Sequence, residues 1–268
     1  IHLISQGMCF LTFVVNIAAS QGEKGMSGEF KDRIIMVSGA SDGIGQQVAV
    51  ALGEAGANVI ALARNEDALQ QTQERIEELG GRCLCIPFDL YDFDNYGKLF
   101  LALKDQIPHL DGLVHCAGEI KRCTPMQYAK TDDFRKMLDI HLSAPNMLTQ
   151  IMFPLLKRAE AASVIFTSCD MVDEDKANWH AYGMAKRALA YAASMWQMEH
   201  PDKPFRFNTL NPGRVRTKLF KRTYGGEHPD KVPPASSVTA AYLYLLSDES
   251  TDIRGQTLHA RNLLESKH

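Results

Sequence analysis

Several features that would point to other protein classes are missing from this chain of 268 residues. Its six cysteines are scattered, and no CxxC pair or zinc-ligand spacing occurs, so the sequence predicts neither a metal site nor a disulfide framework. The formal net charge is only -3, which indicates no strongly basic surface for nucleic acid. Reduced thiols favour a reducing compartment, and we therefore expect a cytoplasmic protein.

A hydrophobic run long enough to cross a membrane is also missing near the N-terminus. The apolar run Met8–Ala19 is shorter than the about 20 residues that a transmembrane helix needs. It resembles the core of a signal peptide, but it contains Asn16 and no basic segment precedes it. A non-native or upstream-translated segment, a leader for an organelle or for secretion, and a docking arm all remain open. We expect residues 1–25 to be a poorly ordered extension and residues 26–268 to form one domain.

Short apolar runs alternate with helical patterns along the rest of the chain. The runs predicted as strands are Ile34–Ser38, Asn58–Leu62, Cys83–Phe88, Gly112–His115, Ser163–Thr167, Phe205–Leu210 and Gln256–His259. The segments predicted as helices are Gly43–Glu54, Glu66–Leu79, Asn95–Gln106, Asp132–Arg158, His180–Glu199 and Ser236–Leu246. This alternation indicates an α/β fold: a single-domain, Rossmann-type, doubly wound parallel sheet of about seven strands with helices on both faces. In such a fold the ligand binds beyond the carboxyl ends of the strands.

Two segments depart from this regular alternation. The helix predicted over Asp132–Arg158 is expected to bend near Pro145 and Pro154, because proline interrupts helical hydrogen bonding. The segment Arg214–Val232 is predicted to be a polar loop, and its cations either meet an anionic substrate or belong to a solvated lid. Those cations are Arg216, Lys218, Lys221 and Arg222.

A glycine-rich turn joins the first predicted strand to the first predicted helix. Gly39, Gly43 and Gly45 form a GxxxGxG pattern, and Ser41 and Ile44 lie within it. Glycines let the backbone approach a ligand closely, and the free N–H groups of a helix N-terminus attract anions. We therefore predict that this turn holds the diphosphate of a dinucleotide, although a merely tight turn would show the same residues.

Tyr182 and Lys186 are one helical turn apart, so their side chains face the same way. A free tyrosine has a pKa of about 10, and a nearby cation favours the phenolate. The pair can thus make a proton donor that works at neutral pH. An exposed helix face would show the same spacing, and the pair gains weight because the glycine-rich turn accompanies it.

Together, the glycine-rich turn and Tyr182-x-x-x-Lys186 resemble the short-chain dehydrogenase/reductase family, and the resemblance extends from Ile34 to about His259. It implies that adenine is contacted after the third strand and the nicotinamide carboxamide after the sixth. The fourth strand ends in His-Cys-Ala-Gly, where the family has Asn-Asn-Ala-Gly. The further cofactor contacts implied in this way are Asp89, Leu90, His115, Ala117, Gly118, Pro212, Gly213, Val215 and Thr217.

The choice of cofactor depends on the end of the second predicted strand. Family members that prefer NAD carry an acidic residue there, but this chain has Ala63 followed by Arg64. A guanidinium suits a phosphate by charge and by geometry, so NADP(H) is favoured. Asp42 complicates this, because many NADP-preferring members have a basic residue beside the second glycine, and Arg64 could also be a solvated surface charge. NAD(H) therefore stays an alternative.

The resemblance also assigns roles near the tyrosine. Tyr182 would exchange the substrate proton, while Lys186 would lower its pKa and hold the nicotinamide ribose. Cys169 stands thirteen residues before Tyr182, where the family has a serine, and Ser168 is adjacent. A thiol is a weaker hydrogen-bond donor than a hydroxyl, and Cys169 is either part of the site or an inert buried thiol. His141 stands where the family has an asparagine that holds a relay water, and it is either a proton relay or a structural residue.

The sequence thus predicts an NADP(H)-dependent oxidoreductase that interconverts a carbonyl and a secondary alcohol, with Tyr182 as acid and base. A second hypothesis is a catalytically degenerate member that binds NADP(H) in a structural or sensing role, because the serine and the asparagine are both replaced. The resemblance further implies a homodimer or homotetramer formed through the long helix and the tyrosine-bearing helix. Trp179 and His180 either line the substrate pocket or only begin that helix, and no residue identifies the substrate.

Overall fold

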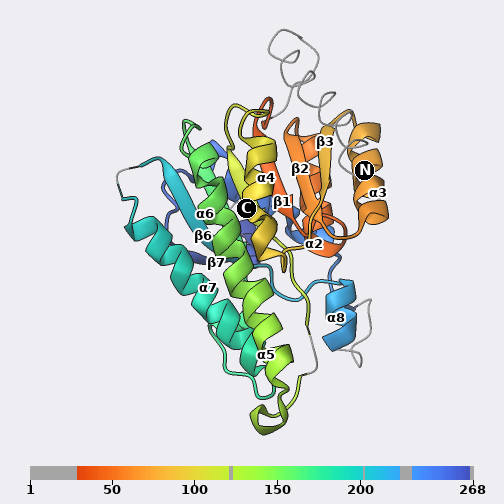
Figure 1. Ribbon diagram of the computed structural model, residues 1–268, viewed down its shortest axis with the longest axis vertical. Helices are drawn as coiled ribbons and strands as arrows, with labels where there is room; N and C mark the ends of the chain where they lie inside the picture. Colours follow the sequence, from red (N-terminus) through yellow and green to blue (C-terminus); the bar gives the residue numbers. More distant parts are fainter. Residues whose placement is uncertain (1–28, 121–122, 202, 224–230, 266–268) are drawn as a thin grey trace.

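The fold is centred on one parallel sheet of seven strands (Figure 1). The computed structural model describes residues 29–120, 123–201, 203–223 and 231–265, so the expectation for residues 1–25 lies outside the described part. The strand order is β3-β2-β1-β4-β5-β6-β7, and every pairing is parallel. The strands are β1 (Ile34–Ser38), β2 (Asn58–Ala63), β3 (Arg82–Pro87), β4 (Gly112–His115), β5 (Ala162–Thr167), β6 (Phe205–Asn211) and β7 (Thr257–His259).

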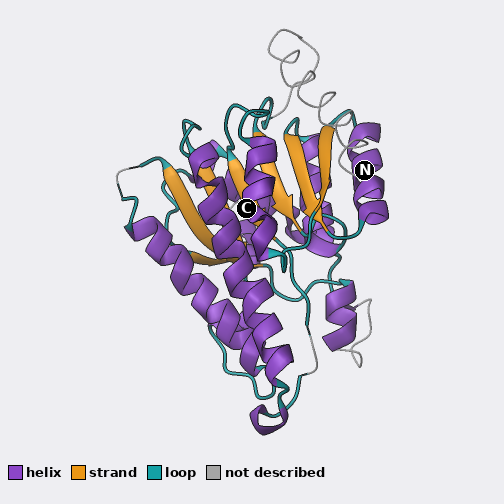
Figure 2. Cartoon of the chain, viewed as in Figure 1, coloured by secondary structure: helices purple, strands orange, loops and turns teal. Residues whose placement is uncertain are grey.

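Helices cover both faces of this sheet (Figure 2), as predicted for a doubly wound fold. One face packs against α2 (Gly43–Glu54), α3 (Glu66–Glu78) and α9 (Thr239–Leu246). The other face packs against α4 (Tyr96–Leu103), α6 (Ala144–Leu156) and α7 (His180–Met198). Single helical turns lie at Phe93–Asn95, Met126–Tyr128, Asp170–Val172, Ala235–Val238 and Asp248–Ser250, and α10 (Ala260–Glu265) follows β7.

The central strands are largely apolar, as expected for strands that are buried on both faces. In β1, Ile34 and Met36 enter one core while Ile35 and Val37 enter the other. A strand sends successive side chains to opposite faces, so a continuous apolar run supplies both layers. The carboxyl ends of the strands all meet at one edge of the sheet, where the functional residues lie.

The predicted long helix is divided at its centre. It comprises α5 (Thr131–Leu138), a π-helical segment Asp139–Ser143 and α6. Pro145 has no N–H, so it cannot donate to the carbonyl four residues earlier, which belongs to His141. The π-helical turn lies at this interruption and contains His141. Pro154 lies inside α6 without ending it.

The segment expected to be a polar loop after β6 contains a helix, and this part of the prediction is wrong. Helix α8 (Lys218–Thr223) begins after Thr217, whose hydroxyl accepts a hydrogen bond from the Phe220 N–H at 3.0 Å. Phe220 is buried, although Lys221 and Arg222 follow it directly. One buried residue in six is too short a pattern for helical periodicity to reveal it.

His115 lies in the core beneath α6, although the resemblance made it a cofactor contact. Its ring stacks on Phe166 with centroids 4.9 Å apart, and Nε2 lies 2.9 Å from the Thr149 hydroxyl oxygen. The Thr149 hydroxyl itself donates to the Pro145 carbonyl, so His115 Nε2 is the donor to Thr149. Burial, with a smaller effect of the Lys186 cation, lowers the pKa of His115 to about 3. A neutral structural histidine therefore replaces the asparagine of the family pattern.

This buried histidine makes the fold sensitive to acid. Below pH 6.5, His115 becomes protonated in the unfolded chain but stays neutral in the folded chain. The free energy of unfolding therefore decreases as the pH falls. Between pH 7 and pH 5.5, the free energy of unfolding of the wild type should therefore fall by about 1 kcal/mol more than that of His115→Asn. Urea denaturation at the two pH values would measure this difference.

His109 provides the control, because its hydrogen bond to Asp111 raises its pKa. His109→Asn should show a difference of the opposite sign, since the native form of that histidine binds its proton more tightly than the unfolded form does. Equal pH slopes for the wild type and His115→Asn would contradict a neutral, buried His115.

Candidate active site

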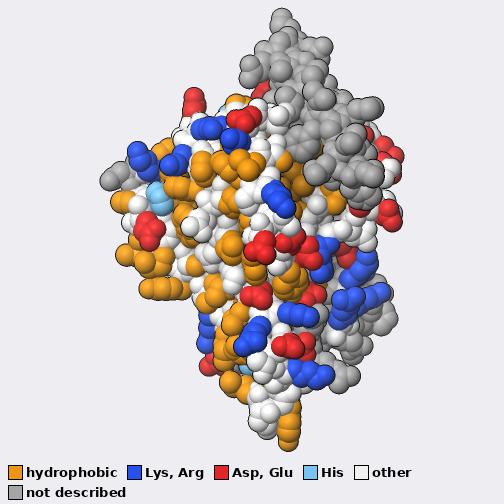
Figure 3. Space-filling view, viewed as in Figure 1, with side chains coloured by type: hydrophobic (Ala, Val, Ile, Leu, Met, Phe, Trp, Pro, Cys, Tyr) orange, Lys and Arg blue, Asp and Glu red, His pale blue; other side chains and the backbone are white. Residues whose placement is uncertain are grey.

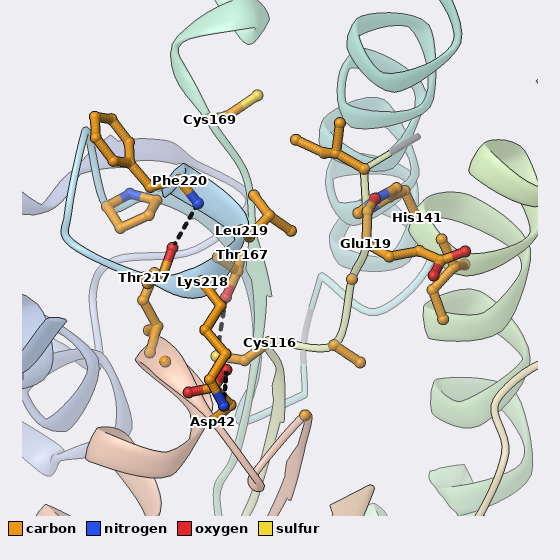
Figure 4. A pocket seen from close by; sticks show the side chains of 18 of the residues that line it. Asp42, Cys116, Glu119, His141, Thr167, Cys169, Thr217, Lys218, Leu219 and Phe220 are labelled. Carbon is orange, nitrogen blue, oxygen red and sulfur yellow. Dashed lines mark hydrogen bonds and ion pairs between the residues drawn. The ribbon is translucent and has the colours of Figure 1, made fainter. Parts of the chain in front are cut away.

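A cleft of about 340 Å³ lies at the carboxyl ends of the strands, where the prediction placed the ligand. The glycine-rich turn and the loop after β3 line one end, and α7 and α8 line the other. Figure 4 shows Glu119 and His141 on one side of the cleft, with Asp42 and the α8 residues on the other. Of the residues predicted to bind or react, the catalytic candidates Tyr182, Lys186, Cys169, His141 and Ser168 all line this cleft.

The glycine-rich turn leaves room that a side chain would fill. Gly39 has a φ of +73°, and a Cβ there would lie 2.7 Å from the backbone of Ala117. Gly43 has a φ of +58° and begins α2, so the free N–H groups of that helix face the cleft. Gly45 does not line the cleft, since it packs against the Gly39 carbonyl and permits the tight turn.

Most of the other predicted cofactor contacts also line the cleft. They are Ser41, Ile44, Arg64, Asp89, Leu90, Ala117, Gly118, Pro212, Gly213, Val215 and Thr217. Gly45 and His115 are the two that do not. Each of the two lies in a motif whose other members line the cleft.

Lys186 is a buried cation at the catalytic end. Its Nζ donates to the Thr167 carbonyl at 2.6 Å and lies 5.7 Å from the centre of the Tyr182 ring. Burial lowers the pKa of Lys186, while nearby Cys169 and Cys116 act in the opposite direction. The α7 helix presents Tyr182 and Lys186 on one face, as their spacing predicted.

The thiol of Cys169 occupies the position beside the tyrosine. A side-chain hydrogen bond joins Cys169 and Tyr182, and burial raises the pKa of Cys169, which keeps the thiol protonated at neutral pH. Ser168 is buried, and its hydroxyl has no hydrogen-bond partner among the described residues. The structure thus assigns the tyrosine contact to the thiol and not to the neighbouring hydroxyl.

His141 presents an unused acceptor to the site. Its Nε2 lies 2.7 Å from the Glu119 carbonyl, so Nε2 carries the hydrogen and Nδ1 is the acceptor. Nδ1 is buried without a partner among the described residues. Burial is the main cause that lowers the pKa of His141 to about 3, so the ring stays neutral, and it meets the Tyr182 ring edge to face at 4.8 Å. Gly118 permits this position, because a Cβ there would lie 2.5 Å from His141 Cε1.

Helix α8 lines the side of the cleft opposite Glu119 and His141. Thr217 packs over Gly43, and Lys218 Nζ lies 3.3 Å from an Asp42 carboxylate oxygen (Figure 4). Figure 3 shows basic side chains gathered where α8 lies in Figure 1. Of the loop cations singled out from the sequence, Lys218 lines the cleft, while Arg216, Lys221 and Arg222 do not.

Sequence reasoning missed several residues of the site. Glu119, Met171 and Phe220 line the cleft, but they belong to no recognised motif and reach it only through tertiary structure. Trp179 also lines the cleft, whereas His180 does not. In the described residues no group of three or more His, Cys, Asp or Glu side chains could hold a metal ion. No described helix has the length and hydropathy needed to span a membrane.

Comparison with known proteins gives a consistent result. The model of the short chain dehydrogenase family matches residues 33–227. The oxidoreductase YciK of Escherichia coli K12 is 34% identical over 233 residues, which cover 86% of this chain and 92% of YciK. A short chain dehydrogenase from Shigella flexneri 2a complexed with NADP has 33% identity and a TM-score of 0.85, covering 88% of this chain and all of that one. A short chain dehydrogenase from Escherichia coli CFT073 complexed with NADPH has 33% identity and a TM-score of 0.83, covering 87% of this chain and 98% of that one.

With the glycine-rich turn, the tyrosine–lysine pair and the parallel sheet all in the places that their sequence order predicted, this chain belongs to the short chain dehydrogenase family.

Proposed function

We propose that the protein is an NADP(H)-dependent oxidoreductase that interconverts a carbonyl and a secondary alcohol. The observation that carries this proposal is the position of Tyr182 beside both a buried cation, Lys186, and a hydrogen-bonding thiol, Cys169, at one end of the cleft. Structural relatives complexed with NADP and NADPH support the choice of cofactor, and Arg64 at the other end of the cleft agrees with it.

The residues present fit the cofactor. The space beside Gly39 and Gly43 would admit a diphosphate at the N-terminus of α2. Arg64 would hold the 2′-phosphate, Asp89 the adenine, and Lys186 the nicotinamide ribose. When bound, the cofactor supplies or accepts the hydride.

The remaining chemistry is proton transfer by this chain's own residues. Tyr182 would donate its phenolic proton to the substrate oxygen in reduction and remove it in oxidation. The Lys186 cation would stabilise the resulting phenolate. Cys169 would hydrogen-bond the substrate oxygen, and the free Nδ1 of His141 would accept a hydrogen bond in the proton relay. A small cavity of about 10 Å³ lies between His141 and Lys186, which is close to the space that one water molecule requires.

The wall around this site is mainly apolar, which supports a substrate whose carbonyl is carried on an apolar body. Its members in the described cleft are Ile120, Ile140, Met171, Trp179, Leu219 and Phe220. Asp170, which also lines the cleft, is already engaged, since it accepts a hydrogen bond from Asn211 and lies 4.0 Å from Arg214.

Removal of the tyrosine hydroxyl tests the proposal directly. Tyr182→Phe should lower carbonyl reduction by about 10²- to 10⁴-fold, because no other group in contact with the substrate would donate the proton. Its affinity for NADPH should change by less than about threefold. Tyr128→Phe is the control, since the Tyr128 side chain is exposed and does not line the cleft. Unchanged turnover in Tyr182→Phe would exclude this mechanism.

A second candidate function rests on the replacement of serine by Cys169. A thiol donates a weaker hydrogen bond to a developing oxyanion, and the loss of one such donor can cost about 10²–10³ in rate. The chain would then bind NADP(H) in a structural or sensing role. Tight NADPH binding without turnover on a broad panel of apolar aldehydes and ketones would favour this second function.

Substitution at position 169 separates the two functions. If the site is catalytic, Cys169→Ser should raise kcat by about tenfold and Cys169→Ala should lower it, because the hydroxyl is the stronger donor and the methyl group donates nothing. Steady-state kinetics with NADPH absorbance would measure both. Identical kcat values for the wild type and both variants would contradict a role for Cys169 in binding the substrate oxygen.

We also propose self-association as a homodimer or homotetramer through α7. Met184, Tyr191 and Met198 are exposed at intervals of seven residues, so they form one stripe along this helix. Figure 3 shows hydrophobic side chains on the face that α6 and α7 present in Figure 1. We further propose a cytoplasmic location, with which the free cysteines of the described residues agree. We also propose that the domain starts near Met26.

Light scattering tests this association. The wild type should have two or four times the chain mass of 29.8 kDa, and Tyr191→Asp should lower the mass because it places a charge in the apolar stripe. Leu101→Asp, at an exposed position of α4, is the control and should leave the mass unchanged. A wild-type mass near that of one chain would overturn the proposal.

A further inference from the structure

The adenosine end of the cleft contains a carboxylate that no motif predicted. Glu119 follows the Ala117-Gly118 turn after β4, and its side chain is only 19% exposed. Each carboxylate oxygen has its own partner. Oε1 accepts a hydrogen bond from the Tyr91 hydroxyl at 2.7 Å, and Oε2 lies 4.0 Å from an Arg64 guanidinium nitrogen. The Arg64 guanidinium carbon also lies 5.9 Å from the centre of the Tyr91 ring.

We propose that Glu119 competes with the 2′-phosphate of NADP(H) for Arg64 and thereby limits the preference of the enzyme for NADP(H) over NAD(H). This inference rests on the proposed function, because it assigns Arg64 to that phosphate. It makes Glu119 a specificity-determining residue that the glycine-rich and tyrosine motifs do not contain.

The two members of the pair differ in mobility. Arg64 has a side chain that is 58% exposed and ends 4.0 Å from the carboxylate, so the contact is weak and Arg64 can leave it. Glu119 is held at two points, by the Tyr91 hydroxyl on its side chain and by His141 Nε2 on its own carbonyl at 2.7 Å. Burial, the Glu119 hydrogen bond and the Glu119 charge raise the pKa of Tyr91, so the phenol remains a neutral donor.

These constraints decide what happens when a cofactor enters. A phosphate presents more charge than a carboxylate and accepts both arms of a guanidinium, so Arg64 would move to it. Glu119 cannot follow, so the binding of NADP(H) costs the attraction between Glu119 and Arg64. NAD(H) carries a hydroxyl at that position and leaves this contact in place. Glu119 therefore weakens the binding of NADP(H) selectively.

The experiment measures cofactor binding alone and needs no substrate. NADPH and NADH would be titrated against the full chain with tryptophan fluorescence, because Trp179 lines the cleft. Glu119→Gln keeps the size of the side chain and an oxygen for the Tyr91 hydroxyl, and removes the charge. We expect its Kd for NADPH to fall by about two- to fivefold at low salt, and its Kd for NADH to change by less than about twofold. The gain should shrink at 0.5 M salt because screening weakens the attraction between Glu119 and Arg64.

Two further variants make the result specific. Glu66→Gln removes an exposed carboxylate that is close to Arg64 in the sequence but does not line the cleft, and both affinities should stay unchanged. In an Arg64→Ala background, Glu119→Gln should increase the NADPH affinity less than it does in the wild type. Competition requires this coupling, because Glu119 then has no Arg64 to hold. A full gain in that background would reduce Glu119 to a general repulsive charge and overturn the competition.

Other outcomes are equally decisive. Weaker NADPH binding by Glu119→Gln would show that Glu119 orients Arg64 and would overturn the proposal, as would equal changes for NADPH and NADH. An Arg64→Ala variant with unchanged NADPH affinity would overturn both the phosphate role of Arg64 and this inference. Selective NADPH tightening in a protein that reduces no carbonyl would support the inference and reject the catalytic function alone.

Discussion

The burial of one ammonium group, that of Lys186, organises the catalytic end of the molecule. A cation removed from water is costly unless nearby groups compensate it, and here the Thr167 carbonyl and the face of the Tyr182 ring do so. The same charge contributes to the low pKa values of His115 and His141, so both imidazoles are neutral. Through Thr167 it connects α7 to the end of β5, which keeps the tyrosine in a constant position relative to the sheet.

The two unusual residues of the site have a common electrostatic setting. Burial keeps Cys169 a neutral thiol, and burial together with the nearby cation keeps His141 a neutral imidazole. Beside Tyr182 the site therefore places the buried Lys186 cation next to a neutral thiol and a neutral imidazole. In the proposed reaction, such an arrangement would stabilise negative charge where it develops, on the substrate oxygen or on the tyrosine, in both directions of the proton exchange.

Much of the fold and of the site could be predicted because the relevant information is local. The seven strands and the Tyr182–Lys186 pair depend on spacing within short segments, and the structure has them where the spacing indicated. Helix α8 was missed because its single buried residue, Phe220, leaves no periodic pattern in six residues. Glu119 was missed for another reason, since its contact with Arg64 joins segments that follow β4 and β2 and exists only when the sheet has formed.

The π-helical segment before Pro145 also has a meaning for how this site can change. A helix turns by about 100° for each residue, and a widened turn accommodates one added residue while the helices on either side keep their faces. Deleting one residue from Asp139–Ser143 would restore a continuous helix and rotate part of that segment away from the cleft while the flanking helices kept their apolar faces on the core. The position of His141 is thus encoded less by its own identity than by the length of the segment that carries it, and a change of one codon in length would remove it from the site.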